Sequence, residues 1–200
     1  MAACNFLYNR RDDAWAFPAS LRIMRFTLVV ALADGLCAVA LAGHTGARVI
    51  GTVRSTPDQQ TALSAGAHDV VPSDKELTAR LRALAPEGVD LIVEVAFGAN
   101  IETDVELLKL GGSIASYATD NPTPNIPFWQ MVFKNIRVYF LGSDDFPKEA
   151  KVQAARDLNG ALAAGWSGFE IGERIPLADI ARAHELVEHP ERPGRVVVVL

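Results

Sequence analysis

Residues 47–55 read Ala-Arg-Val-Ile-Gly-Thr-Val-Arg-Ser, and this stretch decides the fold that the sequence predicts. Its apolar, β-branched centre is bounded by Gly46 on one side and by Thr56 and Pro57 on the other. Short apolar runs between turn-forming residues are typical of buried β-strands. We therefore predict a buried strand over 47–55.

The polar end of this strand indicates what the chain could bind. In a dinucleotide-binding βαβ unit, the end of the second strand faces the adenosine ribose. An acidic side chain there suits NAD, whereas an arginine accommodates the 2′-phosphate of NADP. This strand ends in Arg54 and Ser55, without an acidic residue. Arg54 thus predicts an NADPH site, and the alternative is a solvated arginine at a strand end.

The composition is that of an ordinary globular protein. Of the 200 residues, 50% are hydrophobic and 22% are charged, which fits one domain or one domain with a small appendage. The net charge is −5 and lysines and arginines form no block, so we expect no nucleic-acid partner. Two cysteines and four scattered histidines argue against a protein metal site.

The rest of the chain alternates between strand and helix patterns. The predicted strands are 26–32, 67–71, 89–96, 113–118, 136–141, 173–176 and 195–200. The predicted helices are 35–45 (closed by Gly46), 58–65, 73–84 (with Ser73 and Glu76 as a capping box), 101–110, 147–164 and 178–187. Such alternation implies right-handed crossovers, and therefore an α/β fold: a Rossmann-like, doubly wound parallel sheet with helices on both faces.

Ligands of such sheets bind beyond the carboxyl ends of the strands. This rule brings Arg54, Ser55, 95–98 and 117–119 around one crevice. Glu94 could act as an acid there, but it is better interpreted as capping the backbone or pairing with a neighbour.

Two further segments carry bulky apolar side chains. Residues 128–133 could face substrate or belong to the core, and for Trp129 we favour core or a subunit contact. The strand 136–141, if it is a sheet edge, could pair with a second copy of the chain to form a homodimer.

The turn before the first predicted helix departs from a dinucleotide fingerprint. Residues 30–35 read Val-Ala-Leu-Ala-Asp-Gly, so only Gly35 remains of the pattern G-x-G-x-x-G. Val30 and Leu32 place side chains where the backbone should approach the pyrophosphate, and Asp34 adds a negative charge. This turn argues against tight cofactor binding.

The first residues give no fold, and residues 1–25 are left unassigned. The apolar stretch 26–43 has some features of a secretory signal, but Asp34 in its middle argues against export. We expect a cytoplasmic protein with no membrane partner.

In their order and spacing, these motifs resemble the medium-chain dehydrogenase/reductase superfamily, and within it the zinc-independent NADPH:quinone oxidoreductase branch. The resemblance spans about 46–200 and is carried by ARVIGTVRS (47–55), GVDLIVEVAFG (88–98), LLKLGGSIASYA (107–118), FKNIRVYFLGSDD (133–145) and IGERIPLADIARAHELVE (171–188). It implies a Rossmann-like NADP-binding domain over 26–165 and a remnant of the GroES-like catalytic domain over 166–200. The N-terminal catalytic lobe of the family is missing, so the chain resembles a truncated member.

The resemblance also implies a set of cofactor contacts, with no catalytic side chain among them. Gly35 belongs to the glycine turn, and Asp58 stands where this branch often has a lysine. The implied contacts are Arg54 and Ser55 at the 2′-phosphate, Val95 and Ala96 at the ribose, Tyr117, Ala118 and Thr119 on the nicotinamide side, Phe140, Leu141 and Gly142 along the nicotinamide, and Arg195 or Arg192 near the phosphates.

The expected activity is hydride transfer from NADPH to a small molecule, a quinone or an α,β-unsaturated carbonyl. In such a reaction the cofactor carries the chemistry and the protein supplies orientation. The alternative is a catalytically inactive Rossmann module that only dimerises.

Overall fold

The computed structural model describes residues 27–30, 35–54, 56–166, 171–189, 191 and 194–200. The unassigned segment 1–25 therefore lies outside the described residues. The chain divides into two compact units, Met1–Ala161 and Leu162–Leu200, which are described separately.

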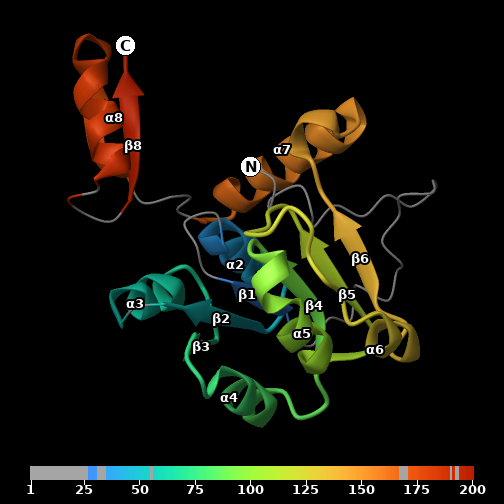
Figure 1. Ribbon diagram of the computed structural model, residues 1–200. Helices are drawn as coiled ribbons and strands as arrows, with labels where there is room; N and C mark the ends of the chain where they lie inside the picture. Colours follow the sequence, from blue (N-terminus) through green and yellow to red (C-terminus); the bar gives the residue numbers. More distant parts are fainter. Residues whose placement is uncertain (1–26, 31–34, 55, 167–170, 190, 192–193) are drawn as a thin grey trace. The chain divides into compact units, whose positions relative to one another are not determined.

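The first unit is built on a six-stranded sheet (Figure 1). Its strands are β1 (Thr27–Val30), β2 (Val49–Val53), β3 (Asp69–Pro72), β4 (Val89–Glu94), β5 (Leu108–Ser116) and β6 (Arg137–Phe140). They pair in parallel in the order β3-β2-β1-β4-β5-β6. The order reverses between β1 and β4, which is where ligands bind in sheets of this kind. The predicted doubly wound parallel sheet is confirmed.

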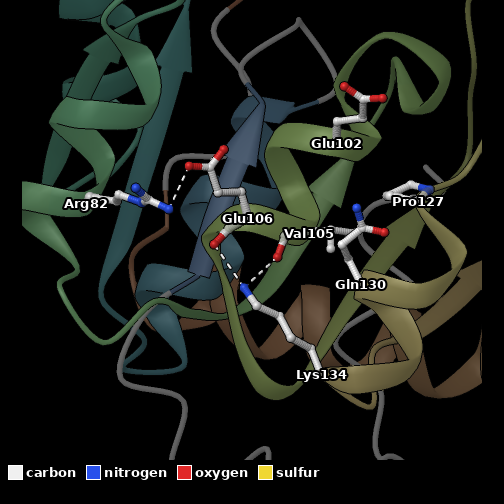
Figure 2. Close-up of a pocket in the computed structure, with 7 residues that line it drawn as sticks. All are labelled: Arg82, Glu102, Val105, Glu106, Pro127, Gln130 and Lys134. Atoms are coloured by element: carbon white, nitrogen blue, oxygen red, sulfur yellow. Dashed lines mark hydrogen bonds and ion pairs between the residues drawn. The ribbon is translucent and has the colours of Figure 1, made fainter.

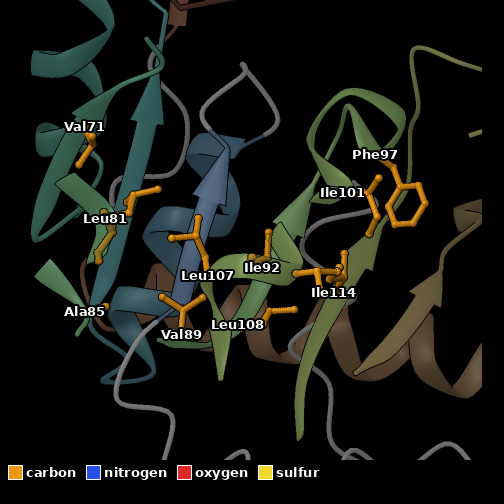
Figure 3. Close-up of a cluster of buried hydrophobic side chains, with 12 residues drawn as sticks. Val71, Leu81, Ala85, Val89, Ile92, Phe97, Ile101, Leu107, Leu108 and Ile114 are labelled. Atoms are coloured by element: carbon orange, nitrogen blue, oxygen red, sulfur yellow. The ribbon is translucent and has the colours of Figure 1, made fainter. Parts of the chain in front are cut away.

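Helices cover both faces of this sheet because its strands are apolar on both sides. The helices are α2 (Gly35–His44), α3 (Thr56–Ser64), α4 (Leu77–Leu84), α5 (Phe97–Leu107), α6 (Phe128–Phe133) and α7 (Lys148–Ala163), with a 3₁₀ turn η2 (Ser143–Asp145). Leu91 and Val93 join the core cluster that contains residues of α2 and α3. Ile92, which points the other way, joins the cluster that contains residues of α4 and α5 (Figure 3). This alternation along β4 is the two-residue period of a strand.

Six of the described glycines have a positive φ, a backbone conformation that other residues rarely take, and two of them show why glycine is needed. Gly46, with φ of 85°, follows α2 and donates its N–H to the Gly43 carbonyl, so the predicted glycine closure of this helix is confirmed. Gly88, also at φ of 85°, precedes β4, and a Cβ there would lie 2.7 Å from the Leu107 carbonyl oxygen. Glycine at this position thus allows the chain to enter β4 close to the start of β5.

Several predicted boundaries are wrong. α5 begins at Phe97 instead of residue 101, and it passes directly into β5, so Gly111 and Gly112 lie in the strand instead of ending a helix. The predicted capping box is also wrong: α4 begins at Leu77, and Asp74 Oδ1 accepts the Glu76 N–H at 2.9 Å. An aspartate turn at the start of α4 replaces the reciprocal Ser73–Glu76 cap.

The second unit is a small βαβ arrangement. β7 (Ile171–Pro176) pairs in parallel with β8 (Arg195–Val199), and between them come a 3₁₀ turn η3 (Leu177–Asp179) and α8 (Ile180–Glu188). Ala183 and Leu186 are the buried residues of α8, which packs against both strands. Among the described helices of both units, none has the length and apolar character needed to cross a membrane.

Candidate cofactor crevice

The carboxyl edge of the sheet brings together three of the predicted segments. Beyond the ends of the strands, the Tyr117 N–H donates to the Glu94 carbonyl at 3.3 Å, and the Leu141 N–H donates to the Ser116 carbonyl at 2.8 Å. Strand pairing thus continues past β4, β5 and β6. As a result, the segments 95–96, 117–119 and 140–142 lie beside one another along this edge.

Glu94 organises the turn between β4 and α5. It is fully buried, and its Oε1 accepts the N–H groups of Val95 at 2.7 Å and Ala96 at 2.5 Å. Its Oε2 accepts the side-chain amide of Asn100 at 3.1 Å. The interpretation of Glu94 as a backbone cap is therefore confirmed.

A second buried carboxyl group, that of Asp104, lies next to Glu94. Burial, and next the charge of Glu94, raise the pKa of Asp104 well above its usual range. The two side chains also interact through a hydrogen bond, while Asp104 Oδ2 has no hydrogen-bond partner within the described part of the chain. Two adjacent buried carboxyl groups cannot both ionise cheaply. Burial beside Glu94 therefore favours the protonated form of the Asp104 carboxyl group.

The loop after β5 holds the other side of the same turn. The Phe97 N–H donates to the Ala118 carbonyl at 3.3 Å. The next two N–H groups of α5, those of Gly98 and Ala99, donate to Thr119 Oγ1 at 3.2 Å and Asp120 Oδ1 at 2.9 Å. Because these donors are used within the chain, the turn offers a ligand carbonyl oxygens and side-chain surface.

The end of β6 adds an aromatic surface. The Phe140 ring is 71% exposed and packs edge-on against Phe97, with centroids 5.2 Å apart. Leu141 is half-buried, and Gly142 is exposed. Together with the exposed Ala118 and Thr119, these residues could flank a planar ring.

The structure describes only some of the remaining residues that were predicted to contact the cofactor. Arg54 is exposed directly after β2, and Gly35 is buried as the first residue of α2. Ser55, Arg192 and the positions 31–34 of the glycine turn lie outside the described residues. Arg195 is half-buried at the start of β8, in the second unit, so its phosphate contact stays a prediction.

A separate pocket of about 490 Å³ lies between α4, α5 and α6 (Figure 2). Its two cations have partners within the chain. Arg82 pairs with Glu106 at 2.6 Å. Lys134 Nζ donates to three carbonyl oxygens at the end of α5 and the start of β5, those of Val105 at 2.7 Å, Glu106 at 3.0 Å and Leu108 at 2.8 Å. Burial lowers the pKa of Lys134, and the charge of Arg82 contributes. Lys134 thus acts as a helix cap, which its sequence context did not reveal.

The helix α6 corrects one prediction. Its Trp129 is 64% exposed and stacks on Phe133, with centroids 6.0 Å apart, so the assignment of Trp129 to the core is wrong. The alternative, a subunit contact, stays a prediction.

The part of the chain that the structure describes contains no cluster of three or more histidine, cysteine, aspartate or glutamate side chains that could hold a metal ion. Independence of zinc stays a prediction.

Comparison with known proteins identifies the family. The model of the family described as zinc-binding dehydrogenase matches residues 35–155, which is more than half of the chain. The chain belongs to the zinc-binding dehydrogenase family. The predicted resemblance to medium-chain dehydrogenases/reductases and their quinone oxidoreductase branch is thereby confirmed, since the relatives found are quinone oxidoreductases.

Among curated relatives, the quinone oxidoreductase of Lama guanicoe is 27% identical over 83% of this chain and 51% of the relative. That of Homo sapiens is 26% identical over the same shares. The chain therefore spans about half the length of the curated relatives it matches.

Solved structures show the same fold. A mycobacterial quinone oxidoreductase superposes with a TM-score of 0.82 at 24% identity, over 92% of this chain and 59% of that one. The Escherichia coli quinone oxidoreductase complexed with NADPH gives a TM-score of 0.72 at 24% identity, over 88% and 57%.

Proposed function

We propose that the carboxyl edge of the sheet binds NADPH and that the protein reduces a quinone or an α,β-unsaturated carbonyl. The observation that carries the cofactor assignment is Arg54, which is exposed at the end of the second strand where an NAD site would place an acid. The names of the relatives support the substrate class, and the NADPH complex of the Escherichia coli relative supports the cofactor.

The crevice residues fit this cofactor chemically. Arg54 suits the 2′-phosphate, with Ser55 next to it. In the turn, the N–H groups of Val95 and Ala96 are already bonded to Glu94, and the Ala96 carbonyl accepts the N–H groups of Ala99 and Asn100. The Val95 carbonyl oxygen is the acceptor proposed for a ribose hydroxyl, which is a hydrogen-bond donor. Bound NADPH supplies the hydride. In this proposal the side chains orient the nicotinamide, and the exposure of Phe140 and Thr119 at this edge supports that role.

The remaining parts of the proposal come from the sequence. They are an NADP-binding domain over 26–165 with a catalytic-domain segment over 166–200, independence of zinc, a phosphate contact from Arg195, and a cytoplasmic location.

A homodimer through β6 also belongs to the proposal. β6 ends the strand order of the sheet, so one of its sides has no partner strand among the described residues. Unpaired edges readily accept another strand. The exposed aromatic side chains of α6, which precedes β6, add apolar surface to this edge.

One observation favours the alternative, an inactive module that only dimerises. The sequence 30–35 keeps one glycine of the fingerprint and places Asp34 where the pyrophosphate should lie. This argument rests on the sequence alone, because residues 31–34 lie outside the described part of the chain.

Titration with NADPH and NADH, followed by nicotinamide fluorescence, tests the proposal. We expect saturable NADPH binding that Arg54→Ala weakens at least about tenfold, since a hydrogen bond to a charged group contributes about 1.5–3 kcal/mol. NADH, which lacks the 2′-phosphate, should be unaffected. Arg156→Ala, which removes an exposed arginine from α7, is the matched control. Absence of binding at millimolar NADPH would favour the inactive module.

A further inference from the structure

The turn between β4 and α5 contains buried charge that the proposed function does not use. Glu94 is fully buried, and Asp104 is 3% exposed. Asn100 and Asp104 are four residues apart on α5 and therefore share one face of the helix, which is the face that meets Glu94. Buried carboxyl groups are costly to the fold unless they are fully paired. Their presence here indicates a task besides stability.

That task is visible in the hydrogen bonds of Glu94. Its carboxylate holds the N–H groups of Val95 and Ala96, the two residues that begin the turn. Asn100 donates to both carboxylate oxygens, at 3.2 Å and 3.1 Å. Together with the buried Asp104 beside it, Asn100 keeps the Glu94 carboxyl group in this orientation. The conformation of the turn is therefore fixed from beneath, from the protein interior.

We propose that Glu94 is a positioning residue that, with Asn100 and Asp104, shapes the 95–96 turn for the nicotinamide half of the cofactor. The proposal rests on the proposed NADPH function and deepens it. In the sheet order, β2 and β4 lie on either side of β1. Arg54 and the 95–96 turn therefore serve different halves of an extended dinucleotide, and a defect in this turn should affect one half only.

Two probes separate these halves: NADPH, and adenosine 2′,5′-bisphosphate, which carries the adenosine half alone. Glu94→Gln removes one acceptor and sets an amide NH₂ against a neighbouring N–H donor. We expect it to raise the Kd of NADPH about tenfold, which is about 1.4 kcal/mol, and to leave that of the bisphosphate within twofold. Asp90→Asn, on the same strand at the salt bridge with Lys109, is the matched control.

The outcomes are distinguishable. If Glu94→Gln binds NADPH as the unchanged protein does, the positioning role is overturned while the proposed function stands. If Glu94→Gln raises the Kd of NADPH and that of the bisphosphate equally, the role of Glu94 is structural and the inference also fails. If the unchanged protein binds neither probe, the proposed function fails and takes this inference with it. Should Glu94→Gln not fold, Asn100→Ala gives the same test: a raised NADPH Kd with unchanged bisphosphate binding supports the role, and equal effects on both probes overturn it.

Discussion

Replacing Gly98 by alanine should destabilise the protein, although alanine is normally the better helix residue. Gly98 is the second residue of α5. A Cβ added there would lie 2.9 Å from both Asn121 Cβ and Asp120 Oδ1 and 3.1 Å from Thr119 Oγ1. The loop after β5 would have to move away from the helix, and it would lose the hydrogen bonds that Thr119 and Asp120 accept from α5.

The size of the effect follows from these contacts. Each lost capping hydrogen bond lowers the free energy of unfolding by about 1 kcal/mol, so the two together lower it by about 2 kcal/mol. Replacing glycine by alanine in a helix raises it by up to about 1 kcal/mol. The net expectation for Gly98→Ala is a loss of about 1 kcal/mol in the free energy of unfolding.

Gly160→Ala is the matched control, because Gly160 lies in α7 and its added Cβ would meet nothing within 4 Å apart from its chain neighbours and the backbone of its own helix. This substitution should raise the free energy of unfolding by about 0.5–1 kcal/mol. Urea unfolding followed by far-ultraviolet circular dichroism measures both variants. The reasoning is refuted if Gly98→Ala stabilises the protein as much as Gly160→Ala does.

Two other predictions concern buried or capping charges. Lys134→Met should lower the free energy of unfolding by about 1–2 kcal/mol, because three carbonyl oxygens at the end of α5 and the start of β5 lose their donor. Lys75→Met, at an exposed lysine, should change the free energy of unfolding by less than about 0.5 kcal/mol. Equal effects of the two substitutions in urea unfolding would contradict the capping role. The pKa of Asp104 is raised on folding, so the folded state binds more protons than the unfolded state above the ordinary pKa of an aspartate, and stability should fall as the pH rises from there through the folded pKa. Asp104→Asn should remove this component of the slope, and parallel pH profiles of urea unfolding for the two proteins would disprove it.

The sequence was sufficient to predict the parallel sheet and the residues that lie at the ends of its strands. The apolar run of β4 and the glycine after α2 are local signals, because burial on both faces and a left-handed turn each select particular residue types. Right-handed crossover then leaves few possible topologies. The place of Arg54 after the second strand follows from the same short-range patterns, whereas the family was indicated by a resemblance in the order and spacing of several motifs.

The start of α5 was predicted wrongly because its stabilising partners are distant in sequence. Gly98 has the local character of a turn residue, yet α5 includes it, since acceptors 21 residues away at Thr119 and Asp120 cap the helix. Lys134 likewise caps the end of α5 from 26 to 29 residues away. No local pattern encodes such contacts.

The sequence by itself thus determined the α/β fold, the family and the strand ends that could form a cofactor crevice. Only the tertiary structure decided how that edge of the sheet is built: Glu94 is buried beside a second buried carboxyl group, Asp104, and the N–H groups of the turn are already paired. The physical reason is that hydrophobic periodicity is a property of neighbouring residues, whereas the pairing of a buried polar group depends on which distant segment the fold places against it.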